Sequence, residues 1–514
     1  MNGAAVQAVL LAASLAATGL AGIRWLRVAQ REHYLPGSVS RFARRWWSLG
    51  PNRLLGAAAV VALVAAAFSI AAAGLVAAAA IGAGPFGLSL RGRTSPLSWT
   101  RRLRTLAAVA AGLVLIAVAV SWLAGGLRVA AAVSTFAAVA CPLVVDLALV
   151  VTRPLESRLG RRYVLKATAR LRSVAPTVVA ITGSYGKTGT KGYVAHLLSG
   201  TRAVVPTPAS FNNQAGLARA INEQLTPGTD VFVAEMGTYG PGEIAAMCEW
   251  VRPDIAVITA VGPVHLERMG SEARIAQAKA EILGRAPVVV LNVDNEWLAP
   301  LAVSASAAGK KVWRCSSIDR LADVCVVGDG DELHVLAAGS EIARSPVFDA
   351  APTNVACAVA VALELGVPPD RMASRLADLP GPAHRRQVTT GSSGATVIDD
   401  TYNANPAGAA AALGLLGRLG AGRGRRVVVT PGMVELGPRQ QDENTGFGAE
   451  AARVATDVVV VGQTNAAALL AGASGGPARV VRVATREQAV AWVGGQVGDG
   501  DVVLYENDLP DHFP

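Results

Sequence analysis

The sequence changes character near residue 177, and this change divides the chain into two parts that need different folds. Residues 1–172 contain long apolar runs and carry 20 Lys and Arg against 3 Asp and Glu, a net charge of +17. The remaining residues carry 27 Lys and Arg against 34 Asp and Glu, a net charge of −7. Basic clusters beside apolar runs are typical of membrane segments, and they argue against a nucleic-acid surface.

Four apolar runs in the first part approach or exceed the roughly 20 residues that cross a membrane core. They cover residues 4–22, 54–83, 105–124 and 129–151. Positive charge follows the first run, at Arg24 and Arg27, instead of preceding it, which is unlike a secretory signal. We therefore expect a helical transmembrane region over residues 1–152 and a basic juxtamembrane linker over residues 153–176.

Two topologies fit these runs. Four single spans would place the basic loop 24–53 on the opposite side from the C-terminal part. A tight hairpin of two short helices over 54–83 instead keeps loops 24–53 and 84–104 on the cytoplasmic side, as positive charge favours. We expect the hairpin, in a multi-pass protein of the inner cell membrane. Asp146, in the last run, is either a functional carboxylate or an interfacial residue.

Short β-branched runs alternate with helical stretches from residue 177 onward, which is typical of parallel sheets covered by helices. A first series reads TVVAIT, VFVAEM, IAVITAV and VVVLNV, and a second series begins near residue 388. The sequence therefore predicts two α/β domains. The five cysteines form no CxxC pair, so we expect reduced, buried thiols.

A glycine-rich turn follows the first of these strands and precedes a helix. It reads Gly183-Ser184-Tyr185-Gly186-Lys187-Thr188. Backbone N–H groups at such a turn point toward phosphates, a Lys neutralises their oxygens, and a Thr hydroxyl reaches Mg²⁺. Ile181 stands where the full Walker spacing would have its first Gly. The turn predicts nucleotide binding, with a purely structural turn as the alternative.

Lysine usage supports this prediction. The chain has 6 lysines and 41 arginines, and three of the lysines are Lys187, Lys191 and Lys279. In so Arg-rich a chain, a Lys can mark a place that a guanidinium cannot fill. Glu235 ends the strand VFVAEM and His265 follows the strand IAVITAV, where parallel strands converge on a ligand crevice. From spacing alone, His265 fits a core histidine better than a metal ligand.

These motifs occur in the order of a known family. The turn at 183–188, SFNNQAG, AEMGTYGPGEI, AQAKAEI, LNVDNE and IDDTYNANP together resemble the Mur ligase family, most closely its MurF type. The likeness covers about residues 177–500. It implies a central P-loop ATPase domain with a parallel sheet over 177–385 and a C-terminal Rossmann-like α/β domain over 386–514.

The resemblance also implies site roles, residue by residue. Catalysis would involve Lys187, Lys279, His265 and Arg385, with Arg386 as the alternative to Arg385. The ATP site would be formed by Gly183, Ser184, Gly186, Lys187, Thr188, Asn354, Asp400, Tyr402 and Asn405. Two Mg²⁺ ions would be held by Thr188, Glu235, His265 and Lys279, and Lys279 would be carbamylated.

Four stretches depart from the family pattern. Membrane segments stand where the family has a domain that grips the UDP part of its substrate. The usual Gly-Asp-Met reads Pro431-Gly432-Met433, and the usual Lys-Gly-Ser reads Tyr505-Glu506-Asn507. The family's His-Asn pair upstream of Asn354 is also missing.

The resulting hypothesis is an ADP-forming ligase that joins a carboxylate acceptor to an amino acid or dipeptide amine through an acyl phosphate. Its acceptor would be a peptidoglycan-type precursor, and its partners would include ATP and membrane lipid but no nucleic acid. A ligase for another carboxylate and a catalytically idle, membrane-bound nucleotide-binding protein are the alternatives. The joint presence of Lys187, Glu235, His265 and Lys279 disfavours the idle protein.

Overall fold

A computed structural model describes residues 3–67, 71–92, 96–208, 211–329, 332–346, 351–379, 386–402, 404–422, 424–510 and 512–513. The chain forms two compact units. The helical unit comprises Met1–Leu159 together with Leu509–Pro514, and the α/β unit comprises Gly160–Asp508. The last residues therefore group with the helical unit, which departs from the expected C-terminal domain boundary at 514.

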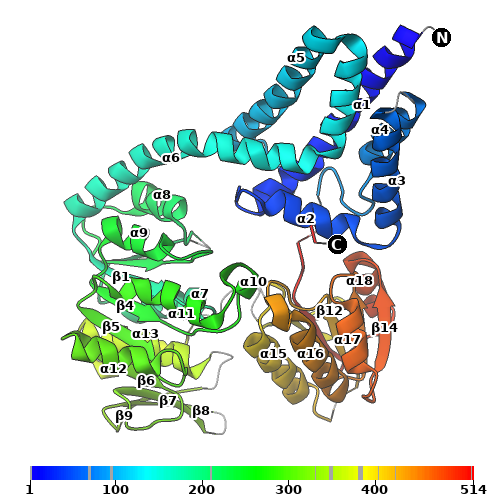
Figure 1. Ribbon diagram of the computed structural model, residues 1–514. Coiled ribbons are helices and arrows are strands. Elements are labelled where there is room, and N and C mark those ends of the chain that lie inside the picture. Colours follow the sequence, from blue (N-terminus) through cyan, green and yellow to red (C-terminus); the bar gives the residue numbers. More distant parts are fainter. Residues whose placement is uncertain are drawn as a thin grey trace. The chain divides into compact units, whose positions relative to one another are not determined.

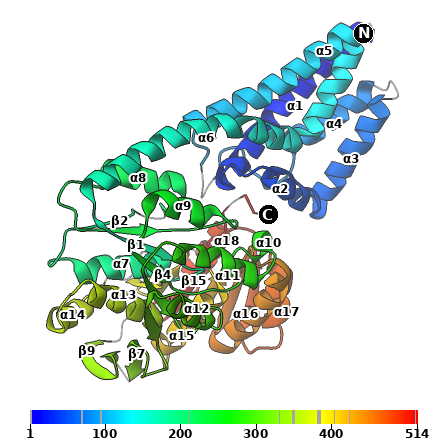
Figure 2. The ribbon, with the colours of Figure 1, turned by 60° about the vertical axis from the view of Figure 1, so that its left-hand side comes forward.

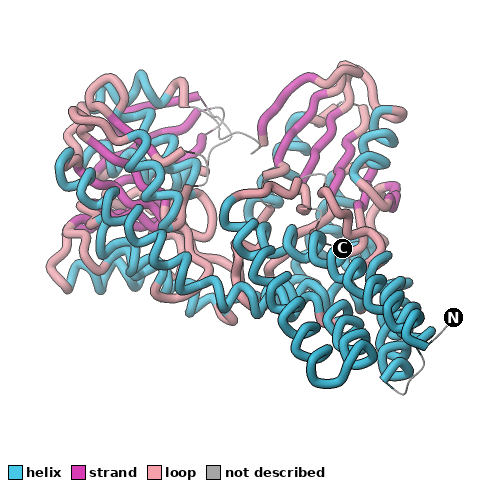
Figure 3. The backbone as a smooth tube through the Cα atoms, turned by 90° about the horizontal axis from the view of Figure 1, so that it is seen from above, coloured by secondary structure: helices cyan, strands magenta, loops and turns pink. Residues whose placement is uncertain are grey.

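The helical unit contains helices and loops, with no strand among its described residues (Figure 3). Its helices are α1 (Gly3–Arg31), α2 (Ser38–Trp47), α3 (Gly50–Ala67), α4 (Ala71–Ala83), α5 (Arg101–Val139) and α6 (Cys141–Val174). Helix α1 packs along α5, and a buried hydrogen bond joins the hydroxyls of Ser14 and Thr135 at 2.9 Å. Helix α6 continues past Leu159 into the α/β unit, so the expected linker over 153–176 is largely helical.

The predicted pair of short helices over 54–83 is present as α3 and α4, which pack side by side (Figure 1). The predicted boundary between the apolar runs 105–124 and 129–151 is present, because Gly126 separates two helical segments within α5. Its non-helical φ of 71° suits a residue without Cβ. The chain then breaks at Ala140, and Pro142 lies in the first turn of α6, where its missing N–H costs nothing.

Two described helices, α1 and α5, are long and apolar enough to cross a membrane. The number rises to three if α2 and α3, which meet at a bend of 106°, form one broken span. This is fewer than the four single spans considered from the sequence.

Asp146 has a structural role within the helical unit. Its carboxylate accepts hydrogen bonds from the backbone N–H groups of Gly37 at 2.9 Å and Ser40 at 2.8 Å, and a longer one from Val39. These groups lie at the start of α2, where helical N–H groups have no partner within the helix. A carboxylate there also meets the positive end of the helix dipole.

The segment after Leu509 is part of the core of the helical unit. Trp46 donates its indole N–H to the carbonyl of His512 at 2.9 Å, and the His512 ring lies 3.1 Å from the carboxylate of Glu32. Phe513 packs edge-on against Phe42, with ring centroids 5.0 Å apart. The side chains of His512 and Glu32 are only 3 % and 4 % exposed, so this segment is buried and not loosely attached.

The α/β unit contains a nine-stranded sheet within its described residues, in the order β2-β3-β1-β4-β5-β6-β7-β8-β9. The strands are β1 (Thr177–Thr182), β2 (Val204–Pro206), β3 (Val231–Glu235), β4 (Ile255–Ile258), β5 (Val288–Asn292), β6 (Lys311–Ser316), β7 (Val324–Asp329), β8 (Glu332–Ala337) and β9 (Ser340–Pro346). All neighbours from β2 to β7 are parallel, and β8 and β9 add an antiparallel edge.

Helices cover both faces of this sheet (Figure 2). They are α7 (Lys187–Leu198), α8 (Gln214–Gln224), α9 (Glu243–Val251), α10 (Leu266–Met269), α11 (Glu272–Ala280), the short η1 (Glu281–Leu283), α12 (Ala299–Ala307), α13 (Pro352–Glu364) and α14 (Pro369–Leu376). Along β1, Val178 and Ala180 face α8, α9 and α11, whereas Val179 and Ile181 face α7 and α13. This alternation explains why the strand is apolar throughout.

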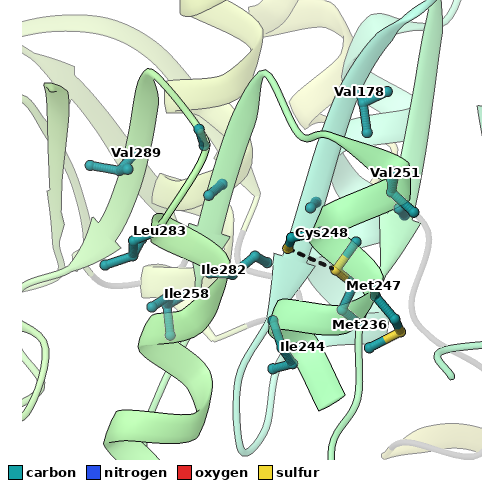
Figure 4. Close-up of a cluster of buried hydrophobic side chains, with 14 of the residues drawn as sticks. Val178, Met236, Ile244, Met247, Cys248, Val251, Ile258, Ile282, Leu283 and Val289 are labelled. Atoms are coloured by element: carbon teal, nitrogen blue, oxygen red, sulfur yellow. Dashed lines mark hydrogen bonds between the residues drawn. The ribbon is translucent and has the colours of Figure 1, made fainter. Parts of the chain in front are cut away.

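One of the two resulting cores is shown in Figure 4. Val178, Ile244, Met247 and Val251 belong to this core together with Cys248, whose sulfur lies 3.9 Å from that of Met236. All five cysteines are buried and free, as the sequence predicts.

A second, six-stranded sheet follows within the described residues, in the order β10-β11-β15-β12-β13-β14. Its strands are β10 (Gln387–Thr390), β11 (Thr396–Asp400), β12 (Arg426–Thr430), β13 (Asp457–Val461), β14 (Arg479–Val483) and β15 (Val502–Glu506). Its helices are α15 (Pro406–Leu419), the short η2 (Gly437–Arg439), α16 (Gln440–Val454), α17 (Ala466–Ala473) and α18 (Arg486–Gly494). All pairs are parallel except β10–β11.

A carboxyl group is buried at the end of β15. Glu506 is fully buried, accepts a hydrogen bond from the Thr430 hydroxyl, and lies beside Asp400 on the neighbouring strand. Burial, reinforced by the negative charge of Asp400, raises the pKa of Glu506 to about 8 despite the Thr430 hydrogen bond.

This pKa predicts a pH-dependent stability. The unfolded chain releases the Glu506 proton above the ordinary value of 4.5, whereas the folded chain retains it up to about 8. The wild-type α/β unit should therefore lose up to about 1.4 kcal/mol per pH unit between these values, relative to Glu506→Gln. Chemical denaturation at pH 5.5 and pH 8 measures the difference. The exposed Glu223→Gln is the control, and a Glu506→Gln variant with the wild-type slope would contradict the prediction.

Candidate nucleotide and metal site

The glycine-rich turn connects β1 to α7 at the carboxyl edge of the first sheet (Figure 2). Two glycines are required by close packing. A Cβ at Gly183 would come within 2.0 Å of the Thr259 hydroxyl, and a Cβ at Gly186 would come within 2.4 Å of Asn354 Oδ1. Gly186 also has a φ of 85°, a conformation that side chains other than Gly disfavour. The turn is therefore fixed between the end of β4 and the start of α13.

The predicted phosphate-binding side chains lie on or beside this turn. Lys187 donates a hydrogen bond to the carbonyl of Gly183 at 2.7 Å, so its ammonium folds back over the turn. Ser184 donates to the carbonyl of Gly262 at 3.1 Å and accepts from its N–H at 3.0 Å. This pairing ties the turn to the loop after β4, while α7 directs its N-terminus toward the turn, as anion binding requires.

Glu235 is the centre of the polar contacts. Its carboxylate accepts hydrogen bonds from the Thr188 hydroxyl at 3.1 Å, the Lys191 ammonium at 2.9 Å and the Asn212 amide at 3.2 Å. Its backbone N–H donates to the Thr207 hydroxyl at 3.1 Å. Strand β3 pairs with β1, which places this carboxylate beside the turn as the sequence predicts. Carboxylate, hydroxyl and amide oxygens are suitable ligands for Mg²⁺.

Lys279 lies near the turn, on α11, with only 4 % of its surface exposed. Burial and, to a lesser extent, the nearby Lys187 ammonium hold the pKa of Lys279 well below its ordinary value. A lysine in this environment loses its proton more readily than an exposed one, and the neutral amine is nucleophilic. Lys279 is therefore close enough to the glycine-rich turn for the charge of Lys187 to affect its pKa.

His265 begins α10 with a φ of 62°. Its Nδ1 atom is paired with the carboxylate of Glu435, which Arg268 also contacts at 3.1 Å. The Tyr239 ring packs edge-on against the imidazole, with centroids 5.1 Å apart. Among the described residues, no three His, Cys, Asp or Glu side chains form a metal-binding group. The predicted role of His265 as a ligand of a second ion stays a prediction.

The remaining predicted nucleotide contacts come from α13 and from the second sheet. Asn354 lies against Gly186 of the turn. Asp400 accepts a hydrogen bond from the backbone N–H of Arg386 at 3.2 Å, and Tyr402 is 48 % exposed. Asn405 is buried and uses its amide oxygen to cap α15, 2.9 Å from the N–H of Gly408. Arg385 lies outside the described residues.

Sequence reasoning missed the role of Lys191. It singled out this residue as one of few lysines but assigned it no partner, because the Glu235 carboxylate is 44 positions away. The rarity of Lys in the chain was the one sequence feature that pointed to a specific role for Lys191.

Two family models match the chain. The Mur ligase middle domain matches residues 181–360, and the Mur ligase glutamate ligase domain matches residues 384–505. Among curated proteins, the UDP-N-acetylmuramoyl-tripeptide–D-alanyl-D-alanine ligase of Mycobacterium tuberculosis is 35 % identical over 65 % of this chain and 71 % of its own. The Escherichia coli ligase of the same name is 31 % identical over 60 % of this chain and 71 % of its own.

Solved structures agree with these matches. The MurF ligase of Thermotoga maritima in complex with ADP has a TM-score of 0.59 at 26 % identity, covering 68 % of this chain and 80 % of its own. MurF from Acinetobacter baumannii has the same TM-score at 24 % identity, covering 68 % of this chain and 77 % of its own. This match shows a similarity of fold. The predicted resemblance is thus confirmed, and this chain belongs to the Mur ligase family.

Proposed function

We propose that this protein is a membrane-anchored, ATP-dependent ligase that forms an amide bond on a peptidoglycan-type precursor. The observation that carries the proposal is the buried Glu235 carboxylate beside the glycine-rich turn, in contact with Thr188. The kinship with MurF-type ligases supports the amide-forming activity. The membrane anchor is supported by the two long apolar helices α1 and α5.

The site residues fit the chemistry of activating a carboxylate. A free carboxylate has too poor a leaving group to acylate an amine. Its oxygen attacks the γ-phosphorus of ATP, ADP leaves, and the amine nitrogen then attacks the acyl carbon while phosphate departs. The Lys187 ammonium and the N-terminus of α7 would stabilise the negative charge that accumulates between the two anions.

Thr188 and Glu235 would hold one Mg²⁺, which would offset charge on the ATP phosphates. A neutral Lys279 amine can add to CO₂ to give a carbamate and a proton. The resulting anion would provide oxygen ligands for a second ion, with His265. The low pKa and the burial of Lys279 support this carbamylation, which an Arg could not undergo.

Lys279→Ala should lower ADP-forming ligation at least about 100-fold, because the site loses the carbamate anion. Phosphate release by the purified protein with ATP, Mg²⁺, a carboxylate acceptor and an amine measures this effect. Release should require both acceptor and amine. Added acetate or propionate should restore part of the activity of Lys279→Ala by supplying a carboxylate.

The control is Lys166→Ala, which removes an exposed lysine of α6 and should keep wild-type activity. Phosphate release that needs no acceptor and is unchanged in Lys279→Ala would refute the ligase proposal.

The helical unit would keep the α/β unit at the cytoplasmic face of the inner membrane. Segments 24–53 and 84–104 are rich in Arg, which favours the cytoplasmic side. A lipid-linked acceptor would suit such an enzyme, because the helical unit stands where the family has its UDP-gripping domain.

Membrane integration is testable on the full-length protein in cells. After cell breakage, the chain should sediment with membranes and remain there after washing at pH 11, whereas detergent should release it. Complete release by the alkaline wash would contradict the proposed anchor. A reporter fused after residue 36 distinguishes the topologies. The hairpin places it on the same side as the α/β unit, whereas four single spans place it on the opposite side.

A further inference from the structure

Lys191 is a buried charge with no role among the predicted site residues. It lies one helical turn after Lys187 on α7, and its side chain is only 7 % exposed. Its ammonium lies 2.9 Å from Glu235 Oε2, and the Glu235 side chain is 2 % exposed. This pair is therefore unlike a surface ion pair, and removing either partner would leave the other charge buried and uncompensated.

The same carboxylate oxygen has a second partner. Thr188 donates its hydroxyl to Glu235 Oε2 at 3.1 Å, so the ammonium and the hydroxyl converge on one atom. Thr188 and Glu235 are the residues that the proposed function assigns to Mg²⁺. A divalent cation that binds both must share this oxygen with an existing positive charge or displace it.

We propose that Lys191 is a positioning residue that holds Glu235 in the metal-free protein and competes with Mg²⁺ for its Oε2 oxygen. This inference rests on the proposed function, because it presupposes a Mg²⁺–nucleotide site at Thr188 and Glu235. Lys191 keeps the affinity for free metal low. Thr188 and Glu235 would then hold Mg²⁺ together with the nucleotide, whose phosphate oxygens would add the negative charge needed to compete with the Lys191 ammonium.

The choice of Lys in an Arg-rich chain follows from this role. An ammonium is a point charge on a flexible stem, so it can move away from the carboxylate when a metal arrives. A guanidinium would hold the carboxylate through a planar pair of hydrogen bonds and would yield less readily. Asn212, which donates to the other oxygen of Glu235 at 3.2 Å, would keep the carboxylate in place during the exchange.

Lys191→Met tests the inference on the full-length protein in detergent. The readout is the binding of ADP at increasing Mg²⁺ concentrations, measured by calorimetry without turnover. We expect the Mg²⁺ concentration for half-maximal ADP binding to fall on the order of tenfold, because a repelling charge is gone. Without Mg²⁺, the thermal midpoint of the variant should fall, and Mg²⁺ with ADP should raise it more than in the wild type.

The matched control is Lys311→Met, which breaks the ion pair with Glu364 at 2.7 Å, where the lysine is 59 % exposed. It should change neither readout. If Lys191→Met does not fold without metal, the double variant Lys191→Met with Glu235→Gln should fold, because both charges are gone. That variant should also lose the Mg²⁺ dependence of ADP binding.

An unchanged or higher Mg²⁺ requirement in Lys191→Met would overturn the inference, as would a double variant no more stable than the single one. The proposed function fails separately. A wild-type protein that binds no ADP at any Mg²⁺ concentration would refute the nucleotide site itself.

Discussion

The buried carboxylate of Glu235 organises the candidate site. It joins the end of β3, the first turn of α7 and the segment before α8 through Thr188, Lys191 and Asn212. Because Glu235 is only 1 % exposed, water cannot replace a missing partner, and each contact must be made by the chain. The first sheet fixes the position of this carboxylate. Strands β3 and β1 are hydrogen-bonded neighbours, and their register places Glu235 beside the glycine-rich turn.

Local patterns in the sequence predicted the strand–turn–helix around 183–188, the two α/β domains and the approach of Glu235 to the turn. They could not predict the Lys191–Glu235 pair, which depends on which strands become neighbours. The contact between His265 and Glu435 also joins distant segments. In the apolar first part, composition predicted helices but misplaced their ends. Alanine-rich sequence favours helix at nearly every position, and only Gly126 and the break at Ala140 interrupt α5 and α6.

Two departures from the family pattern prove to be neighbours in space. The side chain of Asn507 donates a hydrogen bond to the carbonyl of Gly432 at 2.6 Å, and Glu506 is paired with Thr430, just before that loop. Both segments lie at the carboxyl edge of the second sheet, where β12 and β15 run side by side. A change in one therefore alters the packing of the other. The sequence differences in 431–433 and 505–507 therefore change a single region, the carboxyl edge of the second sheet.

The position of residues 509–513 in the core of the helical unit has a consequence for biosynthesis. The sequence of the α/β unit is inserted between two segments of the helical unit. During synthesis, the hydrogen-bond partner of Trp46 is therefore made 466 residues after Trp46 itself. At about 5–20 residues per second, this delay lasts on the order of 20–90 seconds. During that time Phe42, Trp46 and the Glu32 carboxylate lack the contacts that bury them. A ribosome that stalls anywhere within the α/β unit thus releases a chain whose first-made helices are incompletely packed, and quality control can recognise it.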